Sequence, residues 1–245
     1  MSSRRVTVVI PAYDEERRLP ATLAAIDAWA RSNLEACEII VVDDGSTDRT
    51  SEVTRTLAEA CAPPVRVRLR SRAQNLGKGA SVREGVLSAE EPWILMCDAD
   101  LSTPIEELDK LFIETPRHAI VIGSRAAPGA RVDVHQPLYR ELMGKTFNAL
   151  VRLLVTRGIS DTQCGFKLFS REAARAVFSR SRVDRFAIDV EIIYLARRLG
   201  YEVAEVPIVW RNSPHSTVDP LRDSLRMLAD LARIRWMHRE LRPSR

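Results

Sequence analysis

The sequence predicts an α/β fold in which a mostly parallel sheet has helices on both of its faces. Short apolar runs alternate with segments of helical periodicity through the first half of the 245-residue chain. These runs are continuously apolar, which is typical of parallel strands that are buried on both faces. The chain shows no repeats and no linker-like stretch, and its length favours one domain with a short appendage.

The first half alternates strand and helix. Strands are expected at residues 6–10, 39–42, 65–69, 93–97 and 119–123, and helices at residues 19–30, 50–60, 78–88 and 105–112. The third strand differs from the others, because Val65, Val67 and Leu69 alternate with arginines. That alternation predicts a strand with one face toward solvent.

The second half has a less regular pattern. We expect helices at residues 138–155 and 190–199 and a strand at residues 202–210. A last helix over residues 221–239 places apolar residues on one face and arginines on the other. We therefore divide the chain into a domain over residues 1–220 and a C-terminal amphipathic helix over residues 221–245.

Composition and charge exclude several classes of protein. With 45% hydrophobic and 29% charged residues, the chain is neither disordered nor collagen-like. Its net charge of +4 is too small an excess to indicate a nucleic-acid partner. No run approaches the roughly 18 apolar residues of a membrane span. No signal peptide precedes the first strand, and the four cysteines lack short spacing. These features predict a cytoplasmic protein without disulfide bonds or a zinc site.

Ligand-type residues follow each of the five predicted strands, at residues 11–16, 43–48, 75–79, 98–100 and 123–125. In open parallel sheets, ligands bind outside the carboxyl ends of the strands. The sharpest cluster is Asp98-Ala99-Asp100, because two carboxylates one residue apart can share a divalent cation. The alternative is a solvated turn that caps the next helix. The segment 77–79 (GKG) is not a Walker P-loop and is a weak signal on its own.

These motifs, in this order, resemble those of the family 2 glycosyltransferases, whose GT-A fold has a Rossmann-like, mostly parallel sheet. Within that family the chain is most similar to the dolichyl-phosphate glucosyltransferases and dolichyl-phosphate mannose synthases. The resemblance runs from residue 6 to about residue 235. The motifs that carry it are 11–15 (PAYDE), 41–46 (VVDDGS), 75–79 (NLGKG), 98–104 (DADLSTP), 123–125 (GSR), 161–167 (DTQCGFK), Phe186 and 189–191 (DVE).

The resemblance implies a donor site and a metal site. The residues that would bind the nucleotide sugar are Pro11, Tyr13, Glu15, Val42, Asp44, Lys78, Asp98, Ala99 and Arg211. Asp100 would be the main protein ligand of Mg²⁺ or Mn²⁺, and Asp98 and Ser102 would supply further oxygens.

The resemblance also implies an acceptor site, in which Arg125 and Arg140 would bind a phosphate. The alternative is that these arginines form surface salt bridges. The chain departs from the family at Thr217, where relatives often have a lysine that binds the diphosphate. His215 or Arg222 would then replace that lysine.

The chemistry of glycosyl transfer agrees with this set of residues. Negative charge develops on the leaving diphosphate, and a divalent ion with Arg211 would neutralise it. A lipid monophosphate is already anionic near neutral pH, because its second pKa is about 6, so it needs no general base. A hydroxyl acceptor would need one, and of Asp161, Asp189 and Glu191 we choose Asp189.

The leading hypothesis is an inverting, metal-dependent glycosyltransferase. It would move a hexose, glucose from UDP-glucose or mannose from GDP-mannose, onto polyprenyl or dolichyl phosphate. One alternative is transfer to a soluble hydroxyl acceptor. A second alternative is a non-catalytic protein that binds nucleotide sugars.

The last predicted helix has two interpretations. Its apolar stripe can pack on the body of the protein. Alternatively, arginines such as Arg226, Arg233 and Arg239 can meet anionic headgroups while the stripe enters the membrane interface. Acidic residues among those arginines weaken this attraction. The second interpretation makes the protein peripheral at the inner face of the cell membrane.

Overall fold

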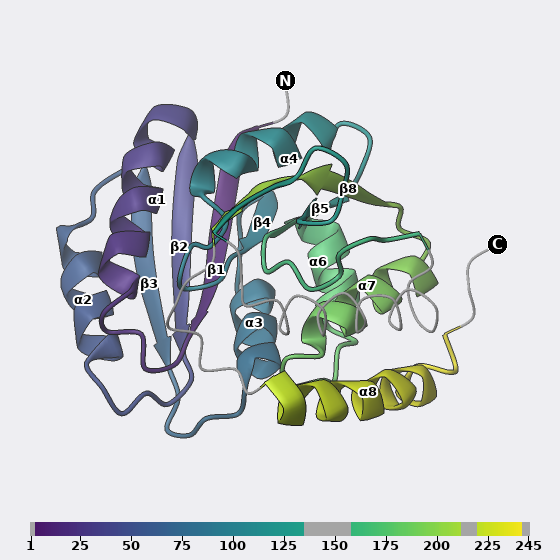
Figure 1. Ribbon diagram of the computed structural model, residues 1–245. Coiled ribbons are helices and arrows are strands. Elements are labelled where there is room, and N and C mark those ends of the chain that lie inside the picture. The colour runs from purple at the N-terminus through teal and green to yellow at the C-terminus, as the bar shows by residue number, and fades with distance from the viewer. Residues whose placement is uncertain (1–2, 135–157, 212–219, 242–245) are drawn as a thin grey trace.

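The computed structural model describes residues 3–134, 158–211 and 220–241. Within these ranges, seven strands form one sheet in the order β3-β2-β1-β4-β7-β5-β8 (Figure 1). Strands β6 and β9 form a second, two-stranded sheet. All neighbours in the large sheet are parallel except the two pairs that β7 makes. The predicted mostly parallel sheet with helices on both faces is confirmed.

The first half of the chain builds four parallel strands. They are β1 (Arg5–Ala12), β2 (Ala36–Asp43), β3 (Val65–Ser71) and β4 (Trp93–Met96). The helices between and after them are α1 (Leu19–Asn33), α2 (Thr50–Ala60), α3 (Lys78–Leu87), the short 3₁₀ helix η1 (Ile105–Glu107) and α4 (Leu108–Glu114). In β1, Val8 and Ile10 face one core and Val9 faces the other, so the run is apolar without interruption.

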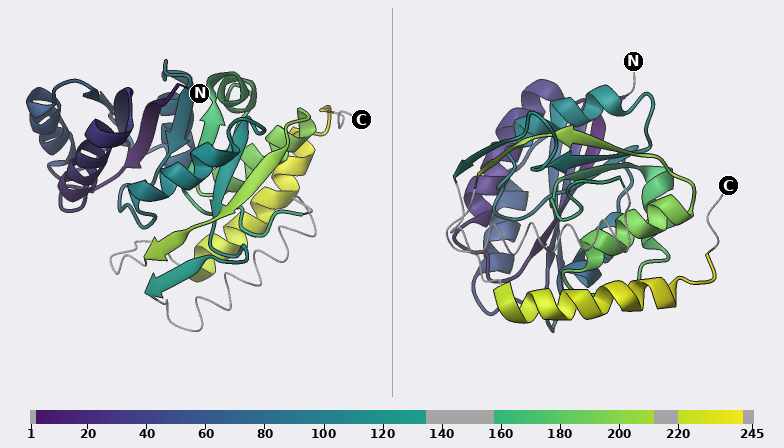
Figure 2. Two further views of the ribbon diagram at one scale, coloured as in Figure 1. Left: turned by 90° about the horizontal axis from the view of Figure 1, so that it is seen from above. Right: turned by 45° about the vertical axis from the view of Figure 1, so that its right-hand side comes forward.

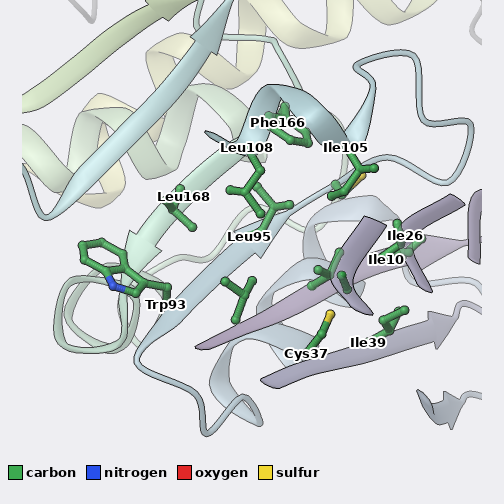
Figure 3. Packing of buried hydrophobic residues seen from close by; sticks show 14 of the residues in the cluster. Ile10, Ile26, Cys37, Ile39, Trp93, Leu95, Ile105, Leu108, Phe166 and Leu168 are labelled. Atoms are coloured by element: carbon green, nitrogen blue, oxygen red, sulfur yellow. The ribbon is translucent and has the colours of Figure 1, made fainter. Parts of the chain in front are cut away.

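A hydrophobic core lies on each face of the sheet. On one face, Ile10, Ile39 and Leu95 from neighbouring strands pack with Ile26 of α1 and Leu108 of α4 (Figure 3). On the other face, the cover consists of α3, α6 (Arg171–Phe178) and α7 (Ile188–Arg198). The sheet is therefore buried on both sides, and its strand ends are left to form a site.

The second half differs from the prediction. Its strands in the large sheet are β5 (Ile120–Ser124), β7 (Lys167–Ser170) and β8 (Val203–Pro207). β7 is antiparallel and lies between β4 and β5. β7 was not predicted, because this four-residue strand begins with a lysine and lacks an apolar run. α6 was not predicted either.

The strand predicted over residues 202–210 is two strands in the structure. β8 joins the large sheet, whereas β9 (Val209–Arg211) pairs with β6 (Arg131–Val134), which was not predicted. Figure 2 (left) shows the teal and lime arrows of this small sheet side by side, extending away from the large sheet. The helix predicted at residues 138–155 lies outside the described residues.

The last helix, α8 (Pro220–Met237), lies along the edge of the molecule toward which the parallel strands point (Figure 1). Leu231 and Ile234 are buried in a cluster with Val190 and Tyr194 of α7. The described part of the helix therefore packs on the body of the protein, as the simpler interpretation expects. Among the described residues, no helix is both long and apolar enough to cross a membrane.

Candidate active site

A cavity of about 600 Å³ opens at the carboxyl ends of the parallel strands. All five of the polar clusters found in the sequence contribute to its wall. The sequence-predicted residues that line it are Pro11, Tyr13, Glu15, Asp44, Lys78, Asp98, Ala99, Asp100, Ser102 and Arg125. Three other predicted residues that the structure describes, Val42, Asp189 and Arg211, lie outside this lining. Arg140 lies outside the described residues.

Asp98 is held in place by an ion pair and by close packing. Its Oδ1 lies 2.8 Å from Nζ of Lys78. Gly165 passes so near that an added Cβ would lie 1.9 Å from Oδ2 of Asp98, so a larger residue there would displace the Asp98 carboxylate. Burial alone would raise the pKa of Asp98, but Lys78, followed by Lys167 and Arg125, outweighs burial and lowers that pKa. Asp98 is therefore an ionised carboxylate with a cation already beside it.

Asp100 has a different environment. Its Oδ1 accepts a hydrogen bond from the backbone N–H of Ser102 at 3.0 Å, and its ion pair with Arg18 is long, at 3.9 Å. Leu101, which lies between Asp100 and Ser102 in the sequence, has a φ of 47°. This left-handed conformation turns the loop sharply after Asp100. The loop thus orients the carboxylate of Asp100, and its oxygens can still bind a cation in the cavity.

The described residues contain no group of three or more His, Cys, Asp or Glu side chains placed to hold a metal ion. From the described residues, a divalent ion at Asp100 would receive part of its coordination shell, and the oxygens of a bound diphosphate or of water would supply the rest. Mg²⁺ commonly binds in this way, through one or two carboxylates and the phosphates of a substrate. Asp100 with Ser102 fits such an ion, whereas Asp98 is already paired with Lys78.

A chain of buried charges extends behind Asp98. Lys78 lies between Asp98 and Asp189, with Nζ 3.2 Å from Oδ2 of Asp189. The other oxygen of Asp189 lies 2.5 Å from Nζ of Lys167, a lysine with no exposed surface. Burial alone would lower the pKa of Lys78, but Asp189 and then Asp98 outweigh burial and raise it. Asp189 therefore meets an ammonium group at each oxygen, and Lys78 reaches the cavity as a cation.

Arg125 forms a second buried ion pair, with Asp161. Its Nε and Nη2 donate to the two oxygens of Asp161 at 2.7 and 2.9 Å, and its backbone N–H donates at 3.0 Å. Burial alone would raise the pKa of Asp161, but Arg125 outweighs burial and lowers it from 3.8 to about 2. The guanidinium also lies over the ring of Trp210, 5.4 Å from its centroid. Arg125 is thus fixed at the cavity wall.

The far end of the cavity is built by β1 and β2. Asp44 accepts hydrogen bonds from the backbone N–H groups of Leu76 at 3.0 Å and Gly77 at 2.6 Å, and pairs with Arg72 at 3.1 Å. It therefore fixes the loop before α3 as well as lining the cavity. Tyr13 is 45% exposed, so its ring is available to a ligand.

Glu15 follows β1, and Asp43 is the last residue of β2. Glu15 is bound by the guanidinium of Arg18. Burial raises the pKa of Glu15, with Arg18 opposing that shift. Asp43 accepts from the backbone N–H of Ser46 at 3.0 Å, a contact that fixes the loop after β2.

Arg211 is placed beside the site by its backbone. Its N–H donates to the carbonyl of Ser102 at 2.8 Å, which links β9 to the loop that carries Asp100. The side chain is 63% exposed and lies 3.7 Å from Asp133 of β6. His215 and Thr217 lie outside the described residues, as does the side chain of Arg222.

Several cavity residues were not assigned a role from the sequence. Arg18, Gln163, Arg185 and Trp210 line the cavity together with Phe186, which the sequence analysis noted only as part of a motif. Phe186 is 41% exposed, which is unusual for a large apolar side chain and marks it as available to a ligand. Arginines are so frequent in this chain that no sequence pattern distinguishes Arg18 or Arg185 from solvated neighbours.

Comparison with known proteins gives matches over nearly the whole chain. The model of the family described as Glycosyl transferase family 2 matches residues 7–178. A dolichyl-phosphate beta-glucosyltransferase from Dictyostelium discoideum is 36% identical over 244 residues, which is 95% of this chain and 74% of that protein. The protein of the same name from Mus musculus is 37% identical over 245 residues, again 95% of this chain and 75% of the relative.

Solved structures with a similar fold are more distant in sequence. Glucosyl-3-phosphoglycerate synthase from Mycobacterium tuberculosis in complex with UDP has a TM-score of 0.67 at 20% identity, covering 94% of this chain and 80% of that one. Mannosyl-3-phosphoglycerate synthase from Rubrobacter xylanophilus has a TM-score of 0.70 at 20% identity, covering 96% and 74%. The mycobacterial synthase has also been crystallised with Mn²⁺ and UDP-glucose.

Proposed function

Because the chain belongs to glycosyl transferase family 2, we propose that it transfers glucose from UDP-glucose to dolichyl phosphate or another polyprenyl phosphate. The resemblance read from the sequence is confirmed, and the chain is a glycosyltransferase. The choice of glucose over mannose is supported by the curated relatives, which are named for glucosyl transfer to dolichyl phosphate.

The observation that carries the proposal is the contrast between Asp98 and Asp100 at the end of β4. Asp98 is neutralised by Lys78 at 2.8 Å, whereas the cation that the described residues place beside Asp100 is Arg18, at the longer distance of 3.9 Å. Asp100, with Ser102, would hold Mg²⁺ or Mn²⁺. The ion would stabilise the negative charge that develops on the departing nucleotide diphosphate.

The residues around this point divide the work. Tyr13, Glu15 and Asp44 would bind the nucleoside, and Lys78 would approach the diphosphate as a cation. Arg125 would orient the acceptor phosphate, because a guanidinium fixed by Asp161 keeps its geometry when the anion arrives. We retain Arg140 and Arg211 as further phosphate ligands in this proposal.

The surroundings of Asp189 favour a phosphate acceptor over a hydroxyl acceptor. A phosphate monoester supplies its own anionic oxygen, so the enzyme needs no base. Asp189, our candidate base, has one oxygen 3.2 Å from Lys78 and the other 2.5 Å from Lys167, and it does not line the cavity. Position and partners both suit a residue that fixes cations rather than one that takes a proton from an acceptor.

We also propose peripheral contact with an anionic membrane surface on the cytoplasmic side. The outer face of α8 carries exposed Arg233, Arg235 and Trp236, and Arg239 follows the helix with its guanidinium 4.9 Å from the centre of the Trp236 ring. Arginines and an interfacial tryptophan are the residues that hold a helix on a charged bilayer. Sedimentation with anionic vesicles at low and high salt tests this contact.

The transfer itself is tested by incubating the purified protein with UDP-glucose or GDP-mannose, Mn²⁺ or Mg²⁺, and a polyprenyl phosphate. We expect glucosyl transfer from UDP-glucose that stops when EDTA removes the metal. Asp189→Asn should retain much of its activity. Transfer only to a hydroxyl acceptor, with Asp189→Asn reduced several thousandfold and still folded, would replace the lipid-phosphate proposal by the soluble-acceptor alternative.

A further inference from the structure

Glu191 on α7 is a buried carboxylate that joins two distant parts of the chain. It has no exposed surface, and it accepts hydrogen bonds from the backbone N–H groups of Arg182 and Val183 at 2.9 Å each. Its Oε1 also lies 2.7 Å from Nε2 of His238, which is 4% exposed. With Nε2 of His238 as the donor, Glu191 accepts all three of these hydrogen bonds.

The backbone that Glu191 holds leads directly into one wall of the cavity. Residues 182–187 pass directly over the start of α3, where the N–H of Ala80 donates to the carbonyl of Asp184 at 3.1 Å. An added Cβ on Gly77 would lie 2.4 Å from the same carbonyl oxygen, so segment and helix are in close contact. The next two residues, Arg185 and Phe186, line the cavity.

The other partner of Glu191 belongs to the C-terminal helix. His238 follows the last residue of α8, and its ring lies 6.4 Å from that of Tyr194 on α7. Leu231 and Ile234 of α8 are buried in the cluster that contains Val183. The helix and the cavity wall thus share an apolar cluster and one buried carboxylate.

We propose that Glu191 and His238 are positioning residues for donor binding, through which α8 fixes the wall that carries Arg185 and Phe186. A buried carboxylate that loses one of its donors is poorly compensated, and its remaining partners rearrange to restore hydrogen bonding. The remaining partners here are the N–H groups of Arg182 and Val183. Loss of the His238 hydrogen bond therefore moves the cavity wall, although His238 touches no part of the cavity.

This inference gives the two faces of α8 different functions. The inner face, through His238, acts on the donor cavity. The outer face carries Trp236 and the arginines that we assign to membrane contact. The outer-face assignment rests on the proposed function, whereas the inner-face assignment needs only a donor nucleotide in the cavity. By thermodynamic linkage, docking of α8 then raises the affinity for the donor by the same factor by which the bound donor favours docking of α8.

The test compares His238→Leu, which removes the N–H donor, with His238→Gln, which can retain one. UDP affinity with Mn²⁺ is measured by calorimetry, and the donor KM and kcat are measured separately. We expect His238→Leu to weaken UDP binding and raise the donor KM about five- to tenfold, the low end of coupling between protein sites. His238→Gln should recover most of this loss.

The matched control is Trp236→Ala on the outer face of the same turn. It should weaken vesicle binding and leave UDP affinity unchanged. Wild-type UDP affinity in a folded His238→Leu protein overturns the proposal, and so does a His238→Gln protein as weak as His238→Leu. These measurements need no acceptor, so they can fail or succeed independently of transfer to a polyprenyl phosphate.

Hydrogen exchange in the wild-type protein gives a second test that no folding defect can obscure. If docking of α8 favours UDP binding, UDP with Mn²⁺ must slow amide exchange in residues 229–241. We expect protection there and in residues 182–187. Exchange in residues 229–241 that is the same with and without UDP contradicts the coupling.

Discussion

The two halves of the molecule reach the same cavity by different physical means. From β1 to β4, regular parallel strands end at one edge, and short loops present Asp44, Asp98 and Asp100 there. From β5 onward the strands are short and one is antiparallel. Lys167 forms a buried ion pair with Asp189, and Arg125 at the cavity wall pairs with the buried Asp161.

This difference shows that apolar periodicity positions the nucleotide end of the site, whereas buried charge positions the opposite end. In the first half, Asp44 binds the backbone N–H groups of Leu76 and Gly77 as well as the guanidinium of Arg72. In the second half, Asp161 and Asp189 are each held by side-chain cations. Substitutions in the first half should therefore affect ligand binding more than stability, and substitutions of buried ions in the second half should affect stability directly.

The largest expected effect is on activity and lies at Asp100. Asp100→Asn should reduce transfer more than about a thousandfold, over 4 kcal/mol of transition-state stabilisation, because a neutral amide is a poor ligand for a divalent ion. The thermal midpoint should hardly change, since among the described residues the side chain of Asp100 accepts one short hydrogen bond, from the N–H of Ser102, and forms a long ion pair with Arg18. Asp27→Asn on the exposed face of α1 is the control. Full activity of Asp100→Asn, or of the wild type in excess EDTA, would remove Asp100 from the metal site.

The contrasting substitution in the second half is Lys167→Met. It removes a fully buried ammonium that bonds to Asp189 and to the carbonyl of Cys164. Breaking a buried pair from one side costs about 3–4 kcal/mol of unfolding free energy, or roughly 6–16 °C in thermal midpoint for a chain of this length. Arg31→Ala, which breaks an exposed pair with Asp27 in the first half, should change the midpoint far less. Equal losses for the two variants would show that the buried ion pair of the second half contributes no more stability than the exposed pair of the first half.

The sequence predicted the first half well, because its signals are local. The apolar run of β4 followed by Asp98 and Asp100 locates the carboxylates at a strand end without any knowledge of distant residues. The same reasoning located Lys78 after β3. The five polar clusters meet in one cavity because parallel strands all end at the same edge.

The second half could not be predicted in this way, because its determinants are pairs of residues that are distant in sequence. Asp189 bonds to Lys78, 111 positions away, and to Lys167, 22 positions away. A lysine in an isolated sequence is expected in solvent, so nothing local marks Lys167 as buried or KLFS as a central strand. The position of Glu191 between two backbone N–H groups and His238 likewise follows from tertiary structure alone.

The pH dependence of stability tests the contribution of the ion pair between Arg125 and Asp161 in the second half. Arg125 holds the pKa of Asp161 at about 2, below its ordinary 3.8. The pair therefore stabilises the fold above pH 3.8, and this contribution is lost as the pH falls through about 2. Urea unfolding of wild type and Asp161→Asn should show a gap in free energy that narrows by about 1–2 kcal/mol between pH 6 and pH 2.5. A gap of constant size would show that the ion pair does not set the acid sensitivity of this half.

The smallest expected effect concerns how helices begin in the two halves. The Oγ of Ser170 accepts a hydrogen bond from the N–H of Ala173 at 3.2 Å and caps α6, whereas the N-cap residues of α1, α2, α3 and, in the second half, α7 form no side-chain cap hydrogen bond. Ser170→Ala should therefore cost about 1 kcal/mol, or roughly 2–4 °C in thermal midpoint, without a change in donor KM. Arg49→Ala is the matched control, because the side chain of Arg49 at the start of α2 forms no cap hydrogen bond, and its midpoint should stay closer to that of the wild type. If Arg49→Ala lost as much stability as Ser170→Ala, the start of α2 would depend on the side chain of Arg49, which lies 3.4 Å from Glu16. Local polar contacts would then support the first half as strongly as they support the second.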